Sequence, residues 1–203
     1  AVRQVLDGFE YVNNCGVKGN RDAIAHIFNI DDRDVIRMSE MGVIASMQPS
    51  WPLYDSFAEY FGIPMMGEKR ILDQYPLGRL KKAGVVVAAG TDFPVMTMLN
   101  PFVGIQIGVT RKNPVTAPDY QNYKDIVCGP ADDLKKDCMR LSDMIQSYTA
   151  SGAYEMFIDD MTGSIEVGKS ADLLILDRDL EETDEMELEF TGIDHMILKG
   201  EIL

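Results

Sequence analysis

The sequence is poor in histidine and cysteine and has no long hydrophobic run. Its 203 residues include two histidines and three cysteines. Cys15, Cys128 and Cys138 have no CxxC spacing, so we expect neither a disulfide framework nor a zinc knuckle, and we expect a cytoplasmic location. No apolar run approaches the ~20 residues that cross a bilayer. We also expect no signal peptide, because no positively charged start precedes an apolar segment.

Positive charge is also scarce. There are 19 Lys and Arg against 33 Asp and Glu, a formal net charge of −14. Such a chain is repelled by nucleic acids and by anionic membranes, so we expect neither as a partner. The composition, 46% hydrophobic and 26% charged, is that of an ordinary globular protein and argues against disorder and coiled coil.

Apolar segments alternate with helical patterns in the first half of the chain. The predicted strands cover residues 23–27, 43–47 and 85–89, and two of the predicted helices cover residues 2–12 and 76–83. A third helix is expected between them, capped by Asp31 or Asp32 and ended by Gly42. Continuous apolar strands in this order indicate parallel βα units with both faces covered. The fold class is therefore α/β. A helical pattern already present at Val2, with no N-cap before it, favours a piece of a longer protein.

The second half is less regular. We expect residues 50–68 to be irregular, residues 94–140 to be rich in loops with short helices among them, and one helix to run from a cap at Ser142 to about residue 157. Short strands at residues 164–167, 171–176 and 195–198 predict a small β-layer. The acidic run from Glu181 to Glu189 reads as a solvated loop.

Two residues stand where a metal site could form. His26 lies at the end of one predicted strand and Asp92 follows the end of another. Side chains at the carboxyl ends of parallel strands converge, and imidazole with carboxylate suits a divalent metal such as zinc. A hydrogen-bonded structural histidine and a turn aspartate are the competing interpretations. Catalytic zinc usually has three protein ligands, and the other histidine, His195, stands on a late strand and is expected to be structural.

Other candidates are weaker. Arg111 could clamp an anionic substrate, although a structural salt bridge is the favoured interpretation. Residues 163–168 lack the spacing of a phosphate-binding loop. The methionines are expected to fill gaps in the core. No substrate-binding residue can be assigned.

Six segments occur in an order that resembles a known family: IAHI, GVIASMQPSW, YPLGRLKKAGVVVAAGTDFPV, NPFVGIQIGVTR, SYTASGAYEMF and GSIEVGKSADLLILDRDL. Together they resemble the C-terminal part of the amidohydrolase superfamily, in its YtcJ-like branch (amidohydrolase family 3). That branch includes N-substituted formamide deformylases and proteins named exoenzyme regulatory proteins. The resemblance extends from Val2 to Leu203.

The resemblance implies a fold. Residues 1–160 would be the C-terminal portion of a metal-dependent (β/α)₈ TIM barrel, strands six to eight, and residues 161–203 would be returning strands of a composite β-sandwich. The family's His-x-His of strand one and its strand-four and strand-five ligands would lie before residue 1. The chain is therefore expected to be a C-terminal fragment with an incomplete metal site. Its expected partner is a further copy of itself or the missing N-terminal part.

The resemblance also implies a function. His26 and Asp92 would be metal ligands, and Asp92 would be the catalytic base that takes a proton from the attacking water. The reaction would be zinc-dependent hydrolysis of a non-peptide C–N bond in a small molecule, carried out by the parent protein and not by the fragment. Two residues depart from the family pattern: Ala25 stands where Glu is common, and Phe93 stands where a small residue is common, which suggests a narrower pocket wall.

Two other interpretations remain open. The first is a non-catalytic binding or regulatory protein on an amidohydrolase scaffold, since fold does not fix function. The second is a complete small α/β domain with no metal.

Overall fold

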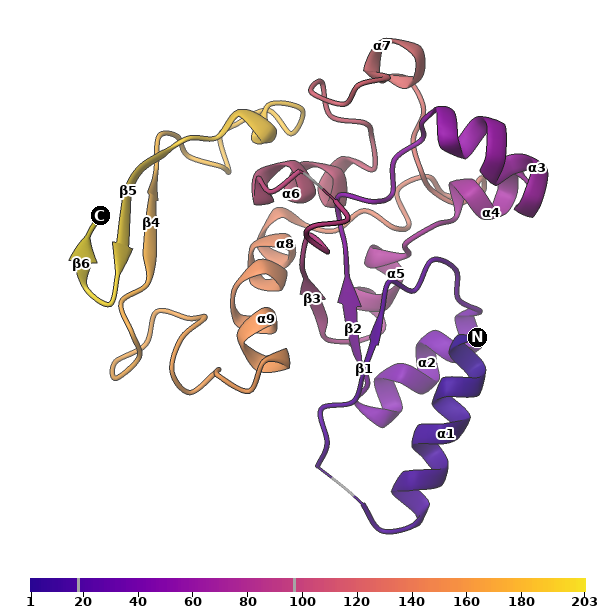
Figure 1. The fold of residues 1–203 in the computed structure, drawn as a ribbon, viewed down its shortest axis with the longest axis horizontal. Coiled ribbons are helices and arrows are strands. Elements are labelled where there is room, and N and C mark those ends of the chain that lie inside the picture. Colours follow the sequence, from indigo (N-terminus) through magenta and orange to yellow (C-terminus); the bar gives the residue numbers. More distant parts are fainter. Residues whose placement is uncertain (18, 97) are drawn as a thin grey trace.

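A three-stranded parallel sheet forms the centre of the protein (Figure 1). The computed structural model describes residues 1–17, 19–96 and 98–203. In this sheet β2 (Ile44–Met47) lies between β1 (Ala23–Ala25) and β3 (Val87–Ala89). Ser46 is the partner of Ala25 on one side and of Ala88 on the other. The expected parallel α/β order is confirmed, and all three strands end at the same edge.

Helices flank this sheet on both sides. Helices α1 (Val2–Asn14) and α2 (Asp32–Met41) pack together near β1, and α5 (Leu77–Lys82) packs near β3. Asp31 caps α2 by accepting a hydrogen bond from the backbone N–H of Arg33, as one of the two predicted caps. The helix ends at Gly42, whose φ of 68° is the left-handed conformation that glycine adopts without a steric penalty.

The segment after β2 is more ordered than predicted. A π-helical turn, η1 (Ala58–Gly62), continues into α3 (Ile63–Met66), and α4 (Glu68–Leu72) follows. The expectation of an irregular segment was wrong, because Gly62 does not break the helical backbone but provides space for a neighbouring side chain. A Cβ at Gly62 would lie 2.6 Å from Cδ1 of Ile71, so the glycine allows α4 to approach closely.

Among the described residues, four α-helices follow β3: α6 (Pro101–Thr110), α7 (Tyr120–Tyr123), α8 (Leu141–Tyr148) and α9 (Ala150–Glu155). The single helix predicted from Ser142 is thus two helices. They break at Thr149, whose φ of −122° and ψ of −94° are not helical. The N-cap position of α8 is Arg140, in extended backbone, and Ser142 lies inside the helix, so the predicted cap was wrong. Helices α8 and α9 both contact β3.

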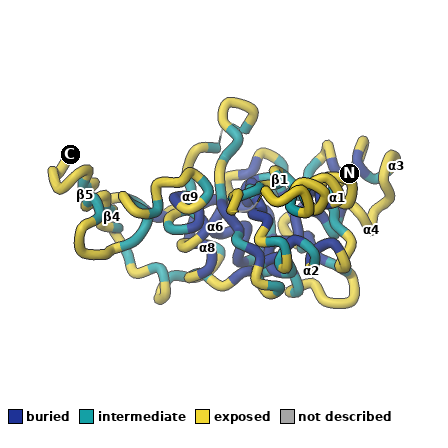
Figure 2. Tube along the Cα trace, turned by 90° about the horizontal axis from the view of Figure 1, so that it is seen from below, coloured by how far each residue is buried: buried dark blue, intermediate teal, exposed yellow. Residues whose placement is uncertain are grey.

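The second sheet is antiparallel, with β5 (Ile193–Leu198) between β4 (Leu173–Leu176) and β6 (Glu201–Ile202). The β5–β6 hairpin turns at Lys199 and Gly200, which both have positive φ, as a tight two-residue hairpin requires. Leu174 and Ile175 are each 48% exposed although they point to opposite faces. Neither face of this sheet is therefore fully covered within the described residues, as the exposed tube in Figure 2 shows.

The predicted strand at residues 164–167 does not form. Ile165 and Val167 are fully or almost fully exposed, and no strand of the described ranges pairs with them. A short 3₁₀ helix, η2 (Leu188–Phe190), interrupts the acidic connection between β4 and β5. No helix in the described parts of the chain is long and apolar enough to cross a membrane.

The main core lies between the parallel sheet and its helices. Ala45 and Met47 of β2 and Val87 of β3 belong to it, together with Leu6 of α1 and Met144 of α8. Strand β1 differs, because Ala23 and Ala25 are exposed. A parallel strand is normally buried on both faces, so β1 is the least protected strand of this sheet.

Candidate active site

His26 and Asp92 meet at the carboxyl edge of the parallel sheet. His26 directly follows β1, and Asp92 follows β3 after two further residues. Nε2 of His26 lies 3.7 Å from Oδ2 of Asp92. Neighbouring strands are about 4.8 Å apart, and β2 separates the two strands, so the side chains lean toward each other across the end of β2.

Left-handed backbone conformations at His26 and Asp92 direct the two side chains toward each other. The φ angles are 66° at His26, 46° at Ile27 and 60° at Asp92. Such angles in residues other than glycine cost about 1–3 kcal/mol and cluster at functional sites. They also explain why β1 is shorter than the predicted strand 23–27: the chain turns at His26, although its N–H still donates to the carbonyl of Ser46.

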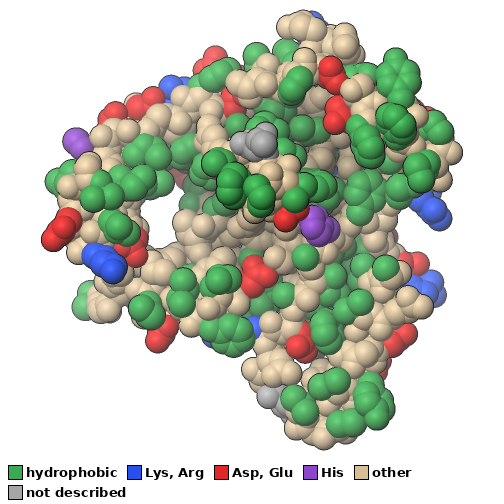
Figure 3. All heavy atoms as spheres, viewed as in Figure 1, with side chains coloured by type: hydrophobic (Ala, Val, Ile, Leu, Met, Phe, Trp, Pro, Cys, Tyr) green, Lys and Arg blue, Asp and Glu red, His purple; other side chains and the backbone are tan. Residues whose placement is uncertain are grey.

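The pair is accessible to solvent and to small ligands. The side chains of His26 and Asp92 are 43% and 34% exposed. Figure 3 shows one histidine beside a carboxylate near the middle of this face, with hydrophobic side chains around them. The other histidine lies at the left edge of the molecule, on the small sheet.

The donor set fits zinc in type but not in number. An imidazole nitrogen and a carboxylate oxygen are both ordinary zinc ligands. Residues 1–17, 19–96 and 98–203 contain no group of three or more His, Cys, Asp or Glu side chains that could hold a metal ion. A catalytic zinc at this point would therefore need at least one further ligand from outside these residues.

An aromatic wall lies behind His26. The ring of Trp51 approaches the imidazole edge-on with centroids 5.3 Å apart, and Tyr75 lies 6.4 Å beyond Trp51. Burial, and secondarily the charge of Asp92, raise the pKa of the Tyr75 phenol above its ordinary value. Tyr75 is therefore neutral at physiological pH.

The turn after β2 holds three unpartnered polar atoms. Oε1 of Gln48, Oγ of Ser50 and Nε1 of Trp51 are buried and have no hydrogen-bond partner within the described protein. Leaving such a buried atom unpaired costs about 1–3 kcal/mol, so each one requires an explanation. Sequence analysis missed these residues. The available signal was their position at the carboxyl end of the strand between those of His26 and Asp92.

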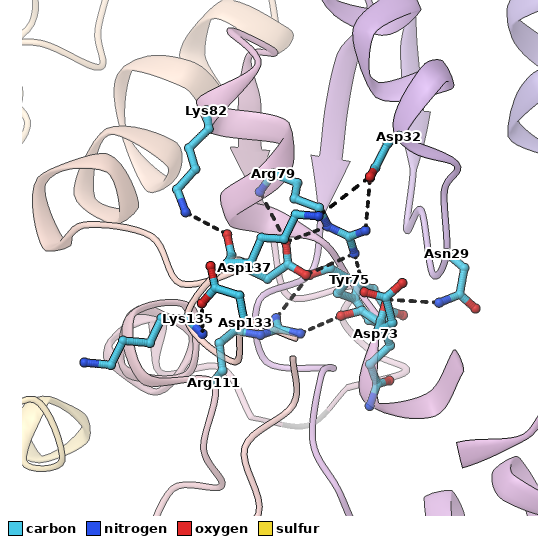
Figure 4. Close-up of polar contacts among 12 residues, drawn as sticks. Asn29, Asp32, Asp73, Tyr75, Arg79, Lys82, Arg111, Asp133, Lys135 and Asp137 are labelled. Atoms are coloured by element: carbon cyan, nitrogen blue, oxygen red, sulfur yellow. Dashed lines mark hydrogen bonds and ion pairs between the residues drawn. The ribbon is translucent and has the colours of Figure 1, made fainter. Parts of the chain in front are cut away.

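Two other candidates do not join the site. His195 is exposed on β5, opposite Ile175. Arg111 is wholly buried, and its guanidinium donates to the carbonyls of Cys128, Gln74 and Tyr75. Figure 4 shows the contact with Tyr75. Both expectations for Arg111, a substrate clamp and a salt bridge, were wrong, because main-chain carbonyls use its donors. Burial lowers the pKa of this guanidinium.

Glu189 also departs from expectation. It ends the acidic run that we expected to be a solvated loop, yet it is buried. Its carboxylate accepts hydrogen bonds from the N–H groups of Val115 and Thr116 and from Nε2 of Gln106. These donors compensate for the loss of water. Glu189 thus fastens η2 to α6 and to the loop after it.

A parallel α/β sheet with polar side chains gathered at its carboxyl edge defines a large class of enzymes that bind their ligands at that edge. Within that class, the chain belongs to the amidohydrolase family, whose family model matches residues 1–203. This confirms the family indicated by the ordered sequence segments.

Curated relatives agree with this assignment. YtcJ of Bacillus subtilis is 25% identical over 185 residues, which are 91% of this chain and 32% of that protein. An N-substituted formamide deformylase of Arthrobacter pascens is 27% identical over 183 residues, 88% of this chain and 30% of that enzyme. The chain thus spans about a third of the length of these relatives.

Solved structures share the fold. A metal-dependent hydrolase of Pyrococcus furiosus superimposes with a TM-score of 0.63 at 24% identity, over 88% of this chain and 31% of that one. An adenosine deaminase of Xanthomonas campestris with bound zinc gives 0.58 at 19% identity, over 95% of this chain and 39% of that one. At these identities the likeness concerns the fold alone.

Proposed function

We propose that this chain is part of a metal-dependent hydrolase that cleaves a non-peptide C–N bond in an amide, formamide or cyclic imide. The observation that carries the proposal is the contact between His26 and Asp92 at the carboxyl edge of the sheet. The similarity to a formamide deformylase, an imidazolonepropionase and a deaminase supports C–N bonds as the target.

His26 and Asp92 would hold a divalent cation, and zinc suits their donor atoms. When bound there, the cation would supply Lewis-acid chemistry, which activates water and polarises a carbonyl. Asp92 acts as the general base: its carboxylate accepts a proton from the attacking water and passes it to the leaving nitrogen. Its partial exposure allows water to reach it, and the left-handed backbone holds it against His26.

Residues 1–203 alone would not carry out the reaction. They supply two donors, and the described residues offer no third one nearby. We propose that the remaining ligands come from polypeptide outside these residues, either joined to this chain or associated with it. The uncovered faces of β1 and of the small sheet would be suitable contact surfaces for such polypeptide.

The test compares residues 1–203 with the protein carrying its natural upstream sequence. Zinc content by mass spectrometry and hydrolysis of N-benzylformamide are measured for both. We expect about one or two zinc ions and activity in the longer protein, and neither in residues 1–203. Full activity of residues 1–203 would contradict the incomplete site. No metal and no hydrolysis in either would favour a binding or regulatory protein on the same scaffold.

Variants of the longer protein assign the base. Asp92→Asn should lower kcat by about 10²- to 10⁴-fold, the usual contribution of general acid–base catalysis. Asp132→Asn, which removes an exposed carboxylate, is the matched control and should leave kcat unchanged. Equal rates for both variants would remove Asp92 from the mechanism.

A further inference from the structure

We propose that the turn formed by residues 48–51 recognises the uncharged amide group of the substrate, through Gln48 Oε1, Ser50 Oγ and Trp51 Nε1. This inference rests on the proposed function, because it concerns the same site. It names a chemical class, neutral carboxamides and imides, and excludes carboxylates of the same size.

The position of the turn is the first argument. It directly follows β2, the strand between those that carry His26 and Asp92, and a hydrogen bond of 3.0 Å from the N–H of Trp51 to the carbonyl of Gln48 closes it. The indole of Trp51 lies edge-on to the ring of His26. A small molecule held between His26 and Asp92 would therefore lie beside this turn.

The unpartnered atoms are the second argument. Gln48 and Ser50 are 7% and 3% exposed, and each has a side-chain atom with no partner in the described protein. Nε2 of Gln48 donates to the carbonyl of Ser46, so the free atom is the acceptor Oε1. The three atoms thus comprise an acceptor, a hydroxyl that can act either way, and an indole donor. An amide offers the complementary set, an N–H and a carbonyl.

The charges around the turn disfavour the binding of anions. Residues 46–54 contain no Lys or Arg, and Asp92 adds a carboxylate nearby. In the 203-residue chain, for which we expect no bound zinc, a carboxylate ligand would meet the like charge of Asp92 and no cation from residues 46–54, whereas a neutral amide meets neutral donors and acceptors.

Binding requires a local movement. The three atoms are covered in this structure, while part of the Trp51 side chain is exposed. The ligand would enter at the exposed part of the indole and displace the turn, so that the covered atoms pair with it. A change at Trp51 is therefore a direct signal of this event.

Trp51 is the sole tryptophan of the chain, so one indole N–H resonance and one fluorescence emitter report on the turn. The 203-residue chain is titrated with N-benzylformamide and, separately, with phenylacetate, an anion of similar size. We expect saturable movement of the indole resonance with N-benzylformamide and none with phenylacetate. No movement with either, or equal movement with both, overturns the proposal. In the first case buried water would be the partner of the three atoms.

Two serine variants separate recognition from stability. Ser50→Ala removes a hydroxyl without a partner, so it should leave Tm unchanged or raise it and yet weaken N-benzylformamide binding roughly three- to tenfold. Ser147→Ala is the matched control: its buried hydroxyl donates to the carbonyl of Asp143 across 2.8 Å, so Tm should fall and binding should not change. Unchanged binding in Ser50→Ala overturns the role of Ser50.

The two proposals fail in different ways. Amide binding without zinc or hydrolysis in the longer protein would refute the proposed function and leave the recognition turn intact. Suppose instead that the longer protein hydrolyses the substrate, while the indole resonance does not move and Ser50→Ala binds N-benzylformamide normally. That result would refute the recognition turn and leave the proposed function intact.

Discussion

Arg111 and Cys128 hydrogen-bond each other in both directions, once through the Arg111 side chain and once through the backbone. Nε of Arg111 donates to the carbonyl of Cys128 across 2.7 Å, and the N–H of Cys128 donates to the carbonyl of Arg111 across 2.8 Å. These two hydrogen bonds hold together the two ends of the segment 112–127. The other guanidinium nitrogens reach back to the segment before α5, at Gln74 and Tyr75.

Arg111→Met should therefore destabilise the protein strongly. The variant keeps a long side chain but leaves the buried carbonyls of Gln74 and Cys128 without donors, and the Tyr75 carbonyl keeps only the N–H of Leu77. We expect a cost of about 3–5 kcal/mol. Urea denaturation measures the loss. Arg140→Met is the control, because the Arg140 side chain is mostly exposed and its ion pair is with Asp143 of α8; little change is expected there. Similar midpoints for the two variants would refute a structural role for the buried guanidinium.

Gly78 should tolerate no side chain. A Cβ there would lie 2.6 Å from the carbonyl oxygens of Lys136 and Cys138, and these are backbone atoms that cannot turn aside. Gly78→Ala should lower the free energy of unfolding by about 1–3 kcal/mol. Gly8→Ala, in α1 with open space around it, should raise that energy by roughly 0.5–1 kcal/mol. Thermal unfolding of both variants checks the opposite signs.

The stability that the ionised Asp31 carboxylate contributes should be lost in acid. Hydrogen bonds from the Arg33 side chain and backbone lower the pKa of Asp31 from 3.8 to about 2. Because the folded-state pKa is depressed, this group stabilises the protein above about pH 4, and the contribution is lost as pH falls toward 2. Asp31→Asn keeps the helix cap but not the charge. Between pH 5 and pH 2 the Tm of the variant should fall less than that of the wild type, and parallel curves would contradict the assignment.

His26 should contribute to zinc affinity, and His195 should not. Asn replaces either histidine with little strain, because it tolerates the left-handed conformation at residue 26. Competition with a chromogenic chelator, on the protein with its upstream sequence, should show at least tenfold weaker zinc binding for His26→Asn. His195→Asn, altered on the exposed small sheet, should match the wild type. Equal affinities would leave His26 outside any metal site.

Local patterns were sufficient for part of the structure. The apolar segments around Ile44 and Val87 are strands because few other structures bury such runs, and the rule that parallel strands end together brings His26 near Asp92. That contact could be predicted from the sequence, whereas the roles of the two residues remain predictions.

Other features depend on distant partners. Glu189 looks like one more charge of an acidic run until the N–H groups of Val115 and Thr116 are known to face it. The donors of Arg111 are taken by carbonyls that no sequence pattern marks. The missing partners of Ser50 and Trp51 can be recognised only after every neighbour has been placed.

The way His26 and Asp92 meet has a mechanical consequence. Strand β1 has one hydrogen-bonded neighbour and two exposed alanines, so its attachment to the sheet is weak. A ligand bound by both side chains links β1 to β3 across the end of β2. It therefore opposes the detachment of β1 from the sheet. Occupancy of the site and retention of the outer strand are then one coupled equilibrium, in which each favours the other.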